Sequence, residues 1–276
     1  MAPKHRGKVL ISSLKPLAVG GMGRLRKGLQ PDGAPLVLRE LHRKFMFRAR
    51  IHLSFVRGTR IREELSPHPN LVFSVERGHH GLRPYEIIEF VPGGTVRQLM
   101  ERERELVRAN EIDILLQVAR AVAYMHQKGI LHLDLKAENC LVRQDPDRLC
   151  VKVTDFDLSR ECGNTRNRRR AGTVRYMAPE ILQSGTVDIG SDVFSFGVFA
   201  YYVVTGHMPF EGTTPEEARR NQVSEKYRVV RPAERVEGLT PKLDQVIMQC
   251  LERSTQKRLP SMSYVCKTLE AIINYG

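Results

Sequence analysis

The sequence lacks the cysteine pattern of a disulfide-bonded or zinc-binding protein. Its five cysteines are scattered through 276 residues and include no Cys-x-x-Cys pair. An odd number of cysteines without a secretion signal is typical of reduced thiols in a cytosol-like compartment. We therefore expect no cysteine-bound metal and a cytoplasmic location.

The sequence also has no apolar run long enough to cross a membrane. The longest run, VFSFGVFAYYVV, is too short and is interrupted by Ser195 and Gly197. The first residues, MAPKHRGK, are charged and polar and contain no apolar signal core. Repeats and low-complexity linkers are absent as well. The length and the ordinary apolar content of 41% predict a soluble globular protein with one large domain or two lobes.

Acidic residues are too few to balance the basic ones, and the net charge is +13. Basic residues gather between Arg39 and Arg62 and in NTRNRRR at 164–170. A solvated face with an exposed loop explains these segments, and so does an acidic partner, a nucleic acid or a membrane surface. Because no aromatic residues are interleaved with the arginines, a base-stacking platform is not expected.

The order of strand and helix patterns predicts two parts. Strand patterns fill the first ninety residues, in KVLISSLKPLA, APLVLREL and YEIIEF. The segment VPGGT at 91–95 breaks the pattern and marks the predicted boundary. Helices dominate after it. One is expected between Asn110 and Gly129, and two more begin at Thr214-Pro215 and Thr240-Pro241.

Three glycines, Gly20, Gly21 and Gly23, lie between two apparent strands. Glycines there let backbone amides approach phosphate oxygens without a Cβ in the way. A glycine-rich hairpin turn is the commoner explanation of such a cluster. They do not form a dinucleotide-binding fingerprint, because no helix pattern follows them.

Polar residues around HLDLKAEN (132–139) carry a more specific signal. Asn139 and Asp155 could supply two oxygen ligands from neighbouring loops, which suits Mg²⁺ bound to phosphates. Asp134 could then accept a proton from an attacking hydroxyl, and Lys136 could neutralise a transferred phosphoryl group. Each residue alone could equally be a turn or capping residue.

Together these motifs resemble those of a protein kinase over nearly the whole chain. HLDLKAEN is similar to the catalytic loop His-Arg-Asp-Leu-Lys-Pro-Glu-Asn, and DFD at 155–157 is similar to Asp-Phe-Gly. Lys136 and Gly172-Thr173 resemble the Ser/Thr branch. Further segments that fit the family's order are AVGGMGRL (18–25), GTVRYMAPE (172–180), SDVFSFGV (191–198) and QKRLP (256–260).

The resemblance implies an α+β, bilobal fold in one protein kinase domain over residues 1–276. The small β-rich N-lobe would cover residues 1–91, with a hinge near 89–94, and the larger helical C-lobe would cover 95–276. It also implies that Asp192 holds the turn at 132–134 and that Glu180 and Arg258 form a buried ion pair.

The resemblance further implies a Ser/Thr kinase that uses ATP and Mg²⁺. Asp134 would deprotonate the substrate hydroxyl, and Lys136 would touch the γ-phosphate. Asn139 and Asp155 would hold Mg²⁺ on the nucleotide phosphates.

The implied nucleotide site draws on the glycine turn, an adenine slot and the hinge. Ile88 would be the gatekeeper, and the backbone of Glu89 and Val91 would bond adenine. Leu25, Val37 and Leu141 would sandwich the adenine ring, and ordinary core packing stays an alternative for these three because both roles demand apolar residues. The whole implied set is Ala18, Gly20, Gly21, Gly23, Leu25, Val37, Arg39, Ile88, Glu89, Val91 and Leu141.

Arg39 is the main departure from the family pattern. It ends LVLR, where the family has a lysine, and guanidinium is larger and fork-shaped. The family's partner glutamate has no counterpart, because residues 57–60 are Arg-Gly-Thr-Arg, and Gly58 argues against a stable helix there. Without that partner, Arg39 is expected to be free to reach phosphate. Arg24, Arg26 and Lys27 could also supply the cation.

Two other departures lie beside the catalytic residues. Leu133 replaces the arginine that binds a phosphorylated activation-loop residue, so activation should not depend on such a phosphate, whatever Thr165 or Thr173 does. Asp157 replaces a glycine whose freedom at positive φ permits a flip of the segment. An aspartate there should restrict the flip and add negative charge near the metals.

Two hypotheses follow. The first is an active Ser/Thr kinase, because Asp134, Lys136, Asn139 and Asp155 are all present. The second is a pseudokinase that acts as a nucleotide-binding scaffold or regulator, because Arg39 replaces the lysine and the helix glutamate is missing. For the active kinase we expect a protein substrate, with acidic segments favoured by the basic loop, and no clear nucleic-acid or membrane binding. The oligomeric state is left open.

Overall fold

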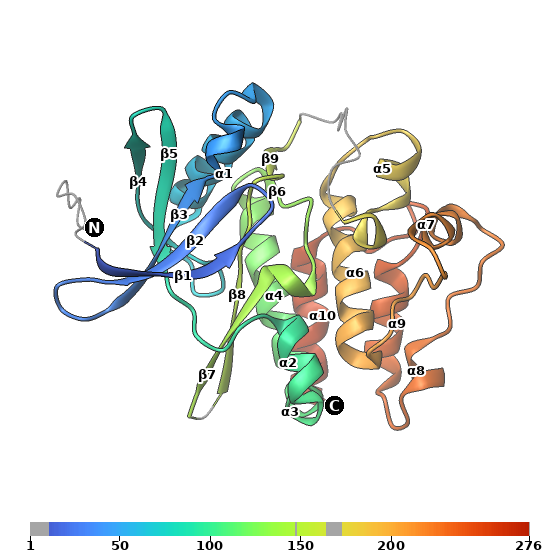
Figure 1. Cartoon of the computed structure of the whole chain (residues 1–276). Coiled ribbons are helices and arrows are strands. Elements are labelled where there is room, and N and C mark those ends of the chain that lie inside the picture. Colours follow the sequence, from blue (N-terminus) through green and yellow to red (C-terminus); the bar gives the residue numbers. More distant parts are fainter. Residues whose placement is uncertain (1–10, 147, 164–172, 276) are drawn as a thin grey trace. The chain divides into compact units, whose positions relative to one another are not determined.

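The computed structural model describes residues 11–146, 148–163 and 173–275 of the chain. Its contacts divide after Val91 into two compact units, unit 1 (Met1–Val91) and unit 2 (Pro92–Gly276). Figure 1 labels the helices and strands of both. The predicted α+β fold class, with a strand-rich part followed by a helical part, is confirmed. The hinge near 89–94 and the single domain over 1–276 stay predictions.

Unit 1 is built on one antiparallel sheet with the strand order β1-β2-β3-β5-β4. Residues paired directly across antiparallel strands share a face of the sheet, so the register decides which side chains meet. A short 3₁₀ turn and one long helix complete the unit. Its elements are β1 (Ser12–Val19), β2 (Gly23–Leu29), β3 (Pro35–Leu41), η1 (Arg43–Phe45), α1 (Ala49–Leu65), β4 (Ser74–His80) and β5 (Arg83–Glu89).

The two faces of this sheet have different neighbours. The cluster face carries a buried apolar cluster of Leu36, Leu38, Tyr85 and Ile87. The helix face carries the alternate residues of β3 and β5, among them Arg39, and side chains of α1 contact it. This alternation follows from the period of two along each strand.

Helix α1 continues through Gly58, so the expectation of a broken helix is wrong. A mid-helix glycine costs only ~1 kcal/mol. Burial of Phe55, Ile61 and Leu65 outweighs that cost, since each buried side chain of this size contributes roughly 1.5–3 kcal/mol. Packing against the sheet therefore decides the structure where local propensity alone does not.

Unit 2 contains most of the helices and two small antiparallel strand pairs, β6 with β9 and β7 with β8. Its first half comprises α2 (Val96–Arg102), α3 (Arg104–Ala109), α4 (Glu111–Gln127), β6 (Ile130–Leu131), η2 (Ala137–Asn139), β7 (Cys140–Asp145), β8 (Arg148–Val153) and β9 (Arg160–Glu161). Its second half comprises η3 (Val174–Tyr176), α5 (Pro179–Gln183), α6 (Ile189–Thr205), α7 (Pro215–Val223), α8 (Pro232–Arg235), α9 (Pro241–Cys250) and α10 (Met262–Tyr275).

Helix α6 forms the centre of unit 2. Every residue from Ser191 to Thr205 is buried, as expected of a helix that is apolar nearly all round. Asp188 caps its start by accepting a bond from the Ser191 amide (3.1 Å), and Gly206 ends it at φ 75°. Among the described residues, no helix combines the length and apolarity that a membrane crossing requires.

The three helices predicted in this part of the chain are all present as α4, α7 and α9. Thr214 caps α7 with its side chain, which accepts a bond from the Glu217 amide (3.1 Å). Asn110 and Thr240 stand at the predicted first positions of α4 and α9, but their side chains make no capping bond. Sequence pattern therefore located the helices correctly and overstated two of the caps.

Candidate active site

The two predicted catalytic segments of unit 2 meet at one end of the β7–β8 hairpin. Cys140 pairs with Val153 across the two strands, so Asn139 and Asp155 lie just beyond the same end. The Thr154 amide donates a hydrogen bond to the Asn139 carbonyl (2.9 Å) and ties the segments together. Local strand pairing thus brings together two residues that are sixteen positions apart in the sequence.

Asp134 is at the centre of the polar contacts in this region. Its Oδ2 accepts hydrogen bonds from Lys136 Nζ (2.8 Å) and Asn139 Nδ2 (3.0 Å). Its Oδ1 accepts bonds from the Thr173 amide (3.2 Å) and hydroxyl (3.4 Å). Lys136 Nζ also donates to Thr173 Oγ1 (2.8 Å). The three predicted catalytic residues therefore belong to one network, which Thr173 closes.

Asn139 and Asp155 present oxygen atoms of the kind that Mg²⁺ prefers. The Asn139 Nδ2 donates to both the carbonyl and the carboxylate of Asp134, which leaves Oδ1 without a hydrogen-bond donor in the described part of the chain. Asp155 is half-buried and accepts one long bond from the Asp157 amide (3.4 Å). One carboxylate and one amide oxygen, completed by phosphate oxygens, suit this cation.

Leu133 and Asp155 both have left-handed backbone, with φ of 63° and 66°. Such a conformation costs an L-residue roughly 1–2 kcal/mol and must be held by its surroundings. Asp192 holds Leu133, because its carboxylate accepts bonds from the His132 and Leu133 amides (2.8 Å each). The prediction that Asp192 fixes this turn is confirmed.

The charge of Asp192 is itself stabilised although the residue is fully buried. Burial alone would raise the pKa of its carboxyl group. The hydrogen bond and charge of His126, with the charge of His132 and the Leu133 amide, outweigh burial and lower the pKa of Asp192 from its ordinary value of 3.8. The turn that carries Asp134 is therefore anchored to an ionised carboxylate.

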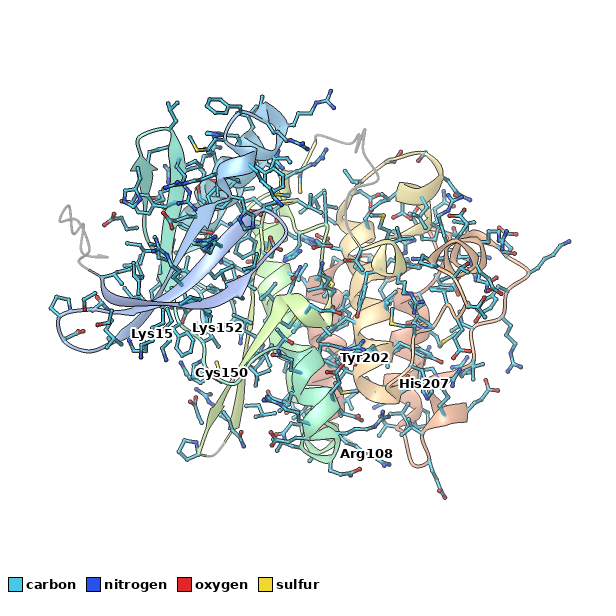
Figure 2. All side chains as sticks on the ribbon, in the orientation of Figure 1. Lys15, Arg108, Cys150, Lys152, Tyr202 and His207 are labelled. Carbon is cyan, nitrogen blue, oxygen red and sulfur yellow. The ribbon has the colours of Figure 1, made fainter. Side chains whose placement is uncertain are left out.

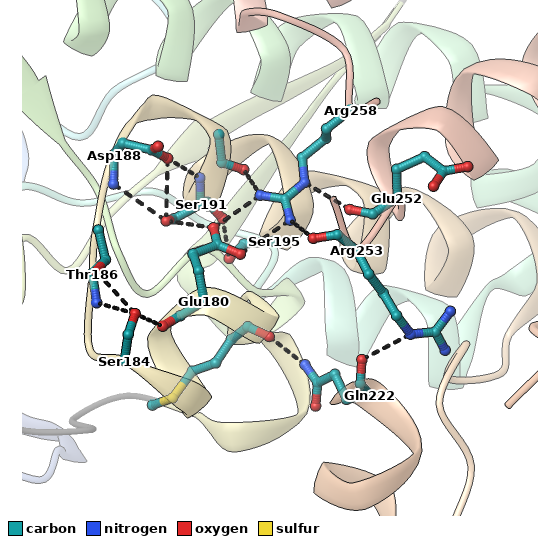
Figure 3. Close-up of polar contacts among 12 residues, drawn as sticks. Glu180, Ser184, Thr186, Asp188, Ser191, Ser195, Gln222, Glu252, Arg253 and Arg258 are labelled. Atoms are coloured by element: carbon teal, nitrogen blue, oxygen red, sulfur yellow. Dashed lines mark hydrogen bonds and ion pairs between the residues drawn. The ribbon is translucent and has the colours of Figure 1, made fainter. Parts of the chain in front are cut away.

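Glu180 and Arg258 form the predicted buried ion pair, which Figure 3 shows in close-up. Two bonds join them, from Arg258 Nη1 (2.9 Å) and Nη2 (3.1 Å). Arg258 also donates to the Gly190 and Glu252 carbonyls (2.7 and 2.9 Å), and Ser191 donates to Glu180 (2.9 Å). These contacts connect α5 with the start of α6 and the segment after α9.

In unit 1, the glycine turn is closed by a bond from the Gly20 amide to the Gly23 carbonyl (2.9 Å). A side chain at Gly23 would meet the Glu40 carbonyl at 2.9 Å and the Phe55 ring at 3.3 Å, so close packing already requires glycine there. A side chain at Gly21 would have nothing within 4 Å. Close packing thus explains the glycine at position 23. The backbone at Gly21 has free space beside it, and an approaching phosphate group requires such space.

Four residues of the predicted nucleotide site, namely Ala18, Leu25, Val37 and Ile88, lie together in unit 1. The register pairs Ala18 with Leu25, Leu25 with Arg39, and Val37 with Ile88. Leu25, Val37 and Ile88 therefore share the helix face with Arg39. Val37 and Ile88 are buried, Leu25 is half-buried and Ala18 is exposed.

Three further predicted nucleotide residues lie at or beyond the end of β5. Glu89 closes that strand, and its amide and carboxylate are bonded to the Phe73 backbone (3.3 and 2.9 Å). Val91 is buried and is the last residue of unit 1. Leu141 belongs to unit 2, where it lies half-buried on β7 and bridges to Thr95. The predicted set is thus divided between the two units.

Arg39 is bonded to a buried carboxylate on the neighbouring strand. Its Nη1 donates to Glu86 Oε1 (2.8 Å), and Arg62 of helix α1 donates from Nε to Glu86 Oε2 (3.0 Å). Glu86 is 0% exposed, Arg62 2% and Arg39 8%. The Arg39 guanidinium also lies 4.4 Å from the centre of the Phe55 ring. We call Arg39, Glu86 and Arg62 the buried triad.

The Glu86 carboxyl group is ionised in this environment. Burial opposes its charge, but the charges of Arg62 and Arg39 and their hydrogen bonds outweigh burial and lower the pKa of Glu86 from its ordinary value of 4.5. The triad therefore carries two positive charges and one negative charge on the helix face.

The neighbouring cations lie on different faces of the sheet. Lys27 pairs with Val37 and so shares the helix face, where its Nζ lies 4.0 Å from the centre of the Phe90 ring. Arg24 and Arg26 pair with Glu40 and Leu38 and lie on the cluster face, opposite Arg39. Of these three cations, Lys27 is the one on the same face of the sheet as Arg39.

Comparisons with known proteins agree with this architecture. The family described as "Protein kinase domain" matches residues 12–269. The chain belongs to the protein kinase domain family. It is 32% identical over 200 residues to serine/threonine-protein kinase PknB of Mycolicibacterium smegmatis, a match that covers 69% of this chain and 31% of that protein.

Other relatives of this kinase domain carry similar names. Serine/threonine-protein kinase PknL of Mycobacterium tuberculosis is 30% identical over 205 residues, which cover 73% of this chain and 50% of PknL. A probable serine/threonine-protein kinase of Clostridium acetobutylicum is 28% identical over 208 residues, which cover 74% of this chain and 31% of that protein. The chain thus spans about a third of the length of several relatives.

Two residues of the kinase domain were missed by sequence reasoning. The expectation that Arg39 is free is wrong, because Glu86 on β5 replaces the missing helix glutamate as its partner. The family pattern directs attention to the helix, where no acid occurs. The signal that could have found Glu86 is its position inside the apolar strand YEIIEF, since a buried charge must be paired. Arg62 supplies the second partner.

Three predictions on the activation segment have different outcomes. NTRNRRR at 164–170 and Thr165 lie outside the described residues. Leu133 is buried and so replaces the family's phosphate-binding arginine with an apolar contact. Asp157 is buried, and its amide contacts the Asp155 carboxylate. Its effect on the metals stays a prediction.

Proposed function

We propose that this protein is an ATP- and Mg²⁺-dependent kinase that transfers the γ-phosphoryl group of ATP to serine or threonine hydroxyls of proteins. The polar network of Asp134, Lys136, Asn139 and Thr173 is the observation that carries the proposal. Membership of the kinase domain family and the names of its relatives support it. The five cysteines, all free thiols, support a reducing cytoplasmic location.

Each residue of the network has a role that its contacts support. Asp134 orients the acceptor hydroxyl and takes its proton, because its carboxylate is held between Lys136 and Thr173 and still reaches solvent. Lys136 neutralises charge on the transferred group. Asn139 and Asp155 would hold Mg²⁺, which would supply positive charge to the nucleotide phosphates. Catalysis here is mostly positioning and charge neutralisation.

Arg39 acts in place of the family's lysine on the nucleotide phosphates. Glu86 fixes one edge of its guanidinium, as a partner carboxylate would fix a lysine. The pseudokinase alternative rested on Arg39 in place of the lysine and on the missing helix glutamate. Glu86 supplies Arg39 with an acidic partner, and the comparisons do not favour that alternative. The glycine turn with its Gly21 amide, the apolar face with Val37, and Ile88 complete the proposed nucleotide site.

We propose that the protein substrate carries acidic residues. A hollow of about 490 Å³ in unit 2 is lined by Arg97, Arg104 and Arg175, together with Tyr202 and His207, the last two labelled in Figure 2. Arg97 is bonded to Glu101 (2.7 Å), which also lines the hollow, and Arg104 to the Thr205 carbonyl (2.6 Å). The Arg175 side chain has no hydrogen-bond or ion-pair partner within the described residues. Arg175 lies in GTVRYMAPE, close to Thr173 of the catalytic network.

Radiolabelled transfer tests the proposed reaction. Purified wild-type protein with Mg-ATP and a generic protein substrate should incorporate label at a rate far above that of Asp134→Asn and Asp155→Ala. Asp134→Asn keeps the size of the side chain, Asp155→Ala removes a carboxylate, and circular dichroism checks that both variants fold. If the wild type incorporates no more label than these variants, the protein is not a kinase.

Peptide kinetics test the substrate preference separately. Arg175→Ala should lower kcat/KM for an acidic peptide by ~10-fold, the equivalent of one lost charged hydrogen bond, and leave a neutral peptide unchanged. Arg228→Ala, which removes an exposed arginine elsewhere in unit 2, is the matched control. An equal loss with both peptides would contradict the role of Arg175.

A further inference from the structure

A basic hollow lies on the cluster face of unit 1, opposite the face that carries Arg39. Its volume is about 630 Å³, and four arginines, two histidines and Glu40 line it. The arginines come from separate parts of the unit: Arg24 and Arg26 from β2, Arg43 from η1 and Arg83 from β5. With neutral histidines, these side chains carry a net charge of +3, from four positive charges and one negative charge.

Glu40 holds part of this surface in place. Its carboxylate is 5% exposed and is bonded to Arg26 (2.5 Å) and Arg83 (3.2 Å), with His80 at 3.5 Å. Arg83 also donates to the Leu41 carbonyl (2.7 Å). A single buried carboxylate thus fixes two guanidinium groups at the wall of the hollow and does not neutralise the rest.

Three arginines that line the hollow have hydrogen-bond donors that are not used in the described part of the chain. Within the described part of the chain, the side chains of Arg24 and Arg43 have no hydrogen-bond or ion-pair partner. Arg26 Nε is buried and has none either. His42 contacts the Gly20 carbonyl through Nε2 (3.0 Å), so the hollow borders the glycine turn. Unpaired arginines gathered in a concave site favour an anionic ligand.

We propose that this hollow binds a compact anion with several phosphate groups, such as an inositol polyphosphate, free or as a lipid headgroup. Guanidinium forks bind phosphate oxygens through paired hydrogen bonds, and four of them can serve more than one phosphate group. The volume lies within the range of small-ligand sites and exceeds what one phosphate fills. This inference does not depend on catalysis.

Calorimetric titration with inositol hexakisphosphate tests the proposal, with Mg-ADP present in excess to occupy the nucleotide site. Arg24→Ala combined with Arg43→Ala should raise the Kd at least ~10-fold, because two charged contacts to phosphate oxygens are lost. Arg50→Ala combined with Arg60→Ala removes two exposed charges from α1 and should leave the Kd within twofold. Thermal melting shows whether both double variants fold.

The possible outcomes distinguish a lipid headgroup from a soluble ligand, and both from the absence of an anion site. If phosphatidylcholine vesicles bind only when they contain phosphatidylinositol 4,5-bisphosphate, and the first double variant loses this binding, the ligand is a lipid headgroup. If only the free compound binds, the ligand is soluble. No binding of either, or an equal loss in both double variants, would overturn the proposal.

Discussion

At the scale of single residues, the buried triad shows how one carboxylate can serve two arginines. Glu86 Oε1 accepts a bond from Arg39 on β3, and Glu86 Oε2 accepts a bond from Arg62 on α1. The guanidinium fork of an arginine has a geometry that suits phosphate as well as carboxylate oxygens. The triad thus joins strand and helix, as the lysine–glutamate pair of the family does by resemblance, with the acid on a different element.

Glu86→Gln should destabilise unit 1 strongly. The amide cannot compensate the two buried guanidinium groups, and removing one partner of a buried ion pair typically costs ~3–5 kcal/mol. Urea denaturation should show a loss of this size. Glu64→Gln removes an exposed carboxylate of α1 that pairs with Arg60, and should change stability by less than ~0.5 kcal/mol. Similar losses in both variants would mean that the triad has no special role.

The same residue should make stability depend on acid pH. The pKa of Glu86 is lower in the folded protein than its ordinary value of 4.5, so the unfolded chain binds the proton more readily. Its contribution is therefore complete above about pH 4.5 and is lost as the pH falls through the folded pKa. Denaturation at pH 6 and at pH 4 should show a smaller drop for Glu86→Gln than for the wild type. An equal drop would contradict this assignment.

The sequence predicted which polar side chains lie together in unit 2 better than it predicted this for unit 1. Asp134, Asn139 and Asp155 lie in short motifs whose spacing fixes their neighbours, so local sequence was sufficient. The partner of Arg39 is 47 residues away and is set by strand register, which no local motif encodes. Arg62 reaches the same carboxylate only because α1 packs on the sheet.

At the scale of elements, close packing of two helices leaves no room for a side chain at Gly197. This glycine lies in the middle of α6, and a side chain there would meet the Cys250 Cβ at 2.7 Å and the Leu251 side chain at 3.2 Å. Helix propensity alone favours alanine by ~1 kcal/mol. Approach of α9 to α6 explains why the sequence has glycine at this position.

Gly197→Ala should therefore lower stability in spite of its higher helix propensity. Overpacking costs typically ~1–3 kcal/mol, which exceeds the gain in propensity. Thermal denaturation should show a lower Tm. Gly21→Ala, where a side chain would meet nothing within 4 Å, should leave the Tm unchanged and serves as the control for stability. A higher Tm for Gly197→Ala would show that α9 can shift.

Elements with a strong periodic pattern were predicted from sequence, and those held by packing were not. Helices α4, α7 and α9 follow apolar spacing or a Thr-Pro start. Strand β4, SVERGHH, contains a glycine and polar residues and gave no strand signal, yet it pairs with β5 along its whole length. Helix α1 was predicted to be unstable because of Gly58, although its buried residues hold it on the sheet.

At the scale of the whole molecule, nucleotide binding should stabilise the protein. Mg-ATP at 100 times its Kd contributes about 2.7 kcal/mol by mass action, which differential scanning fluorimetry should detect as a higher Tm. Asp155→Ala should lose most of the Mg²⁺-dependent part of this shift. A wild-type Tm that does not respond to Mg-ATP would contradict the proposed cofactors.

The central claim is that Arg39, held by Glu86, does the work of the family's lysine in an active kinase. The most direct test is the steady-state kinetics of Arg39→Ala with Mg-ATP, measured beside the wild type. Glu86 keeps Arg62 as a partner in this variant, so the fold should persist. We predict a fall in kcat/KM for ATP of at least ~10-fold, the loss of one charged phosphate contact. Transfer by Arg39→Ala at the wild-type rate would contradict the claim.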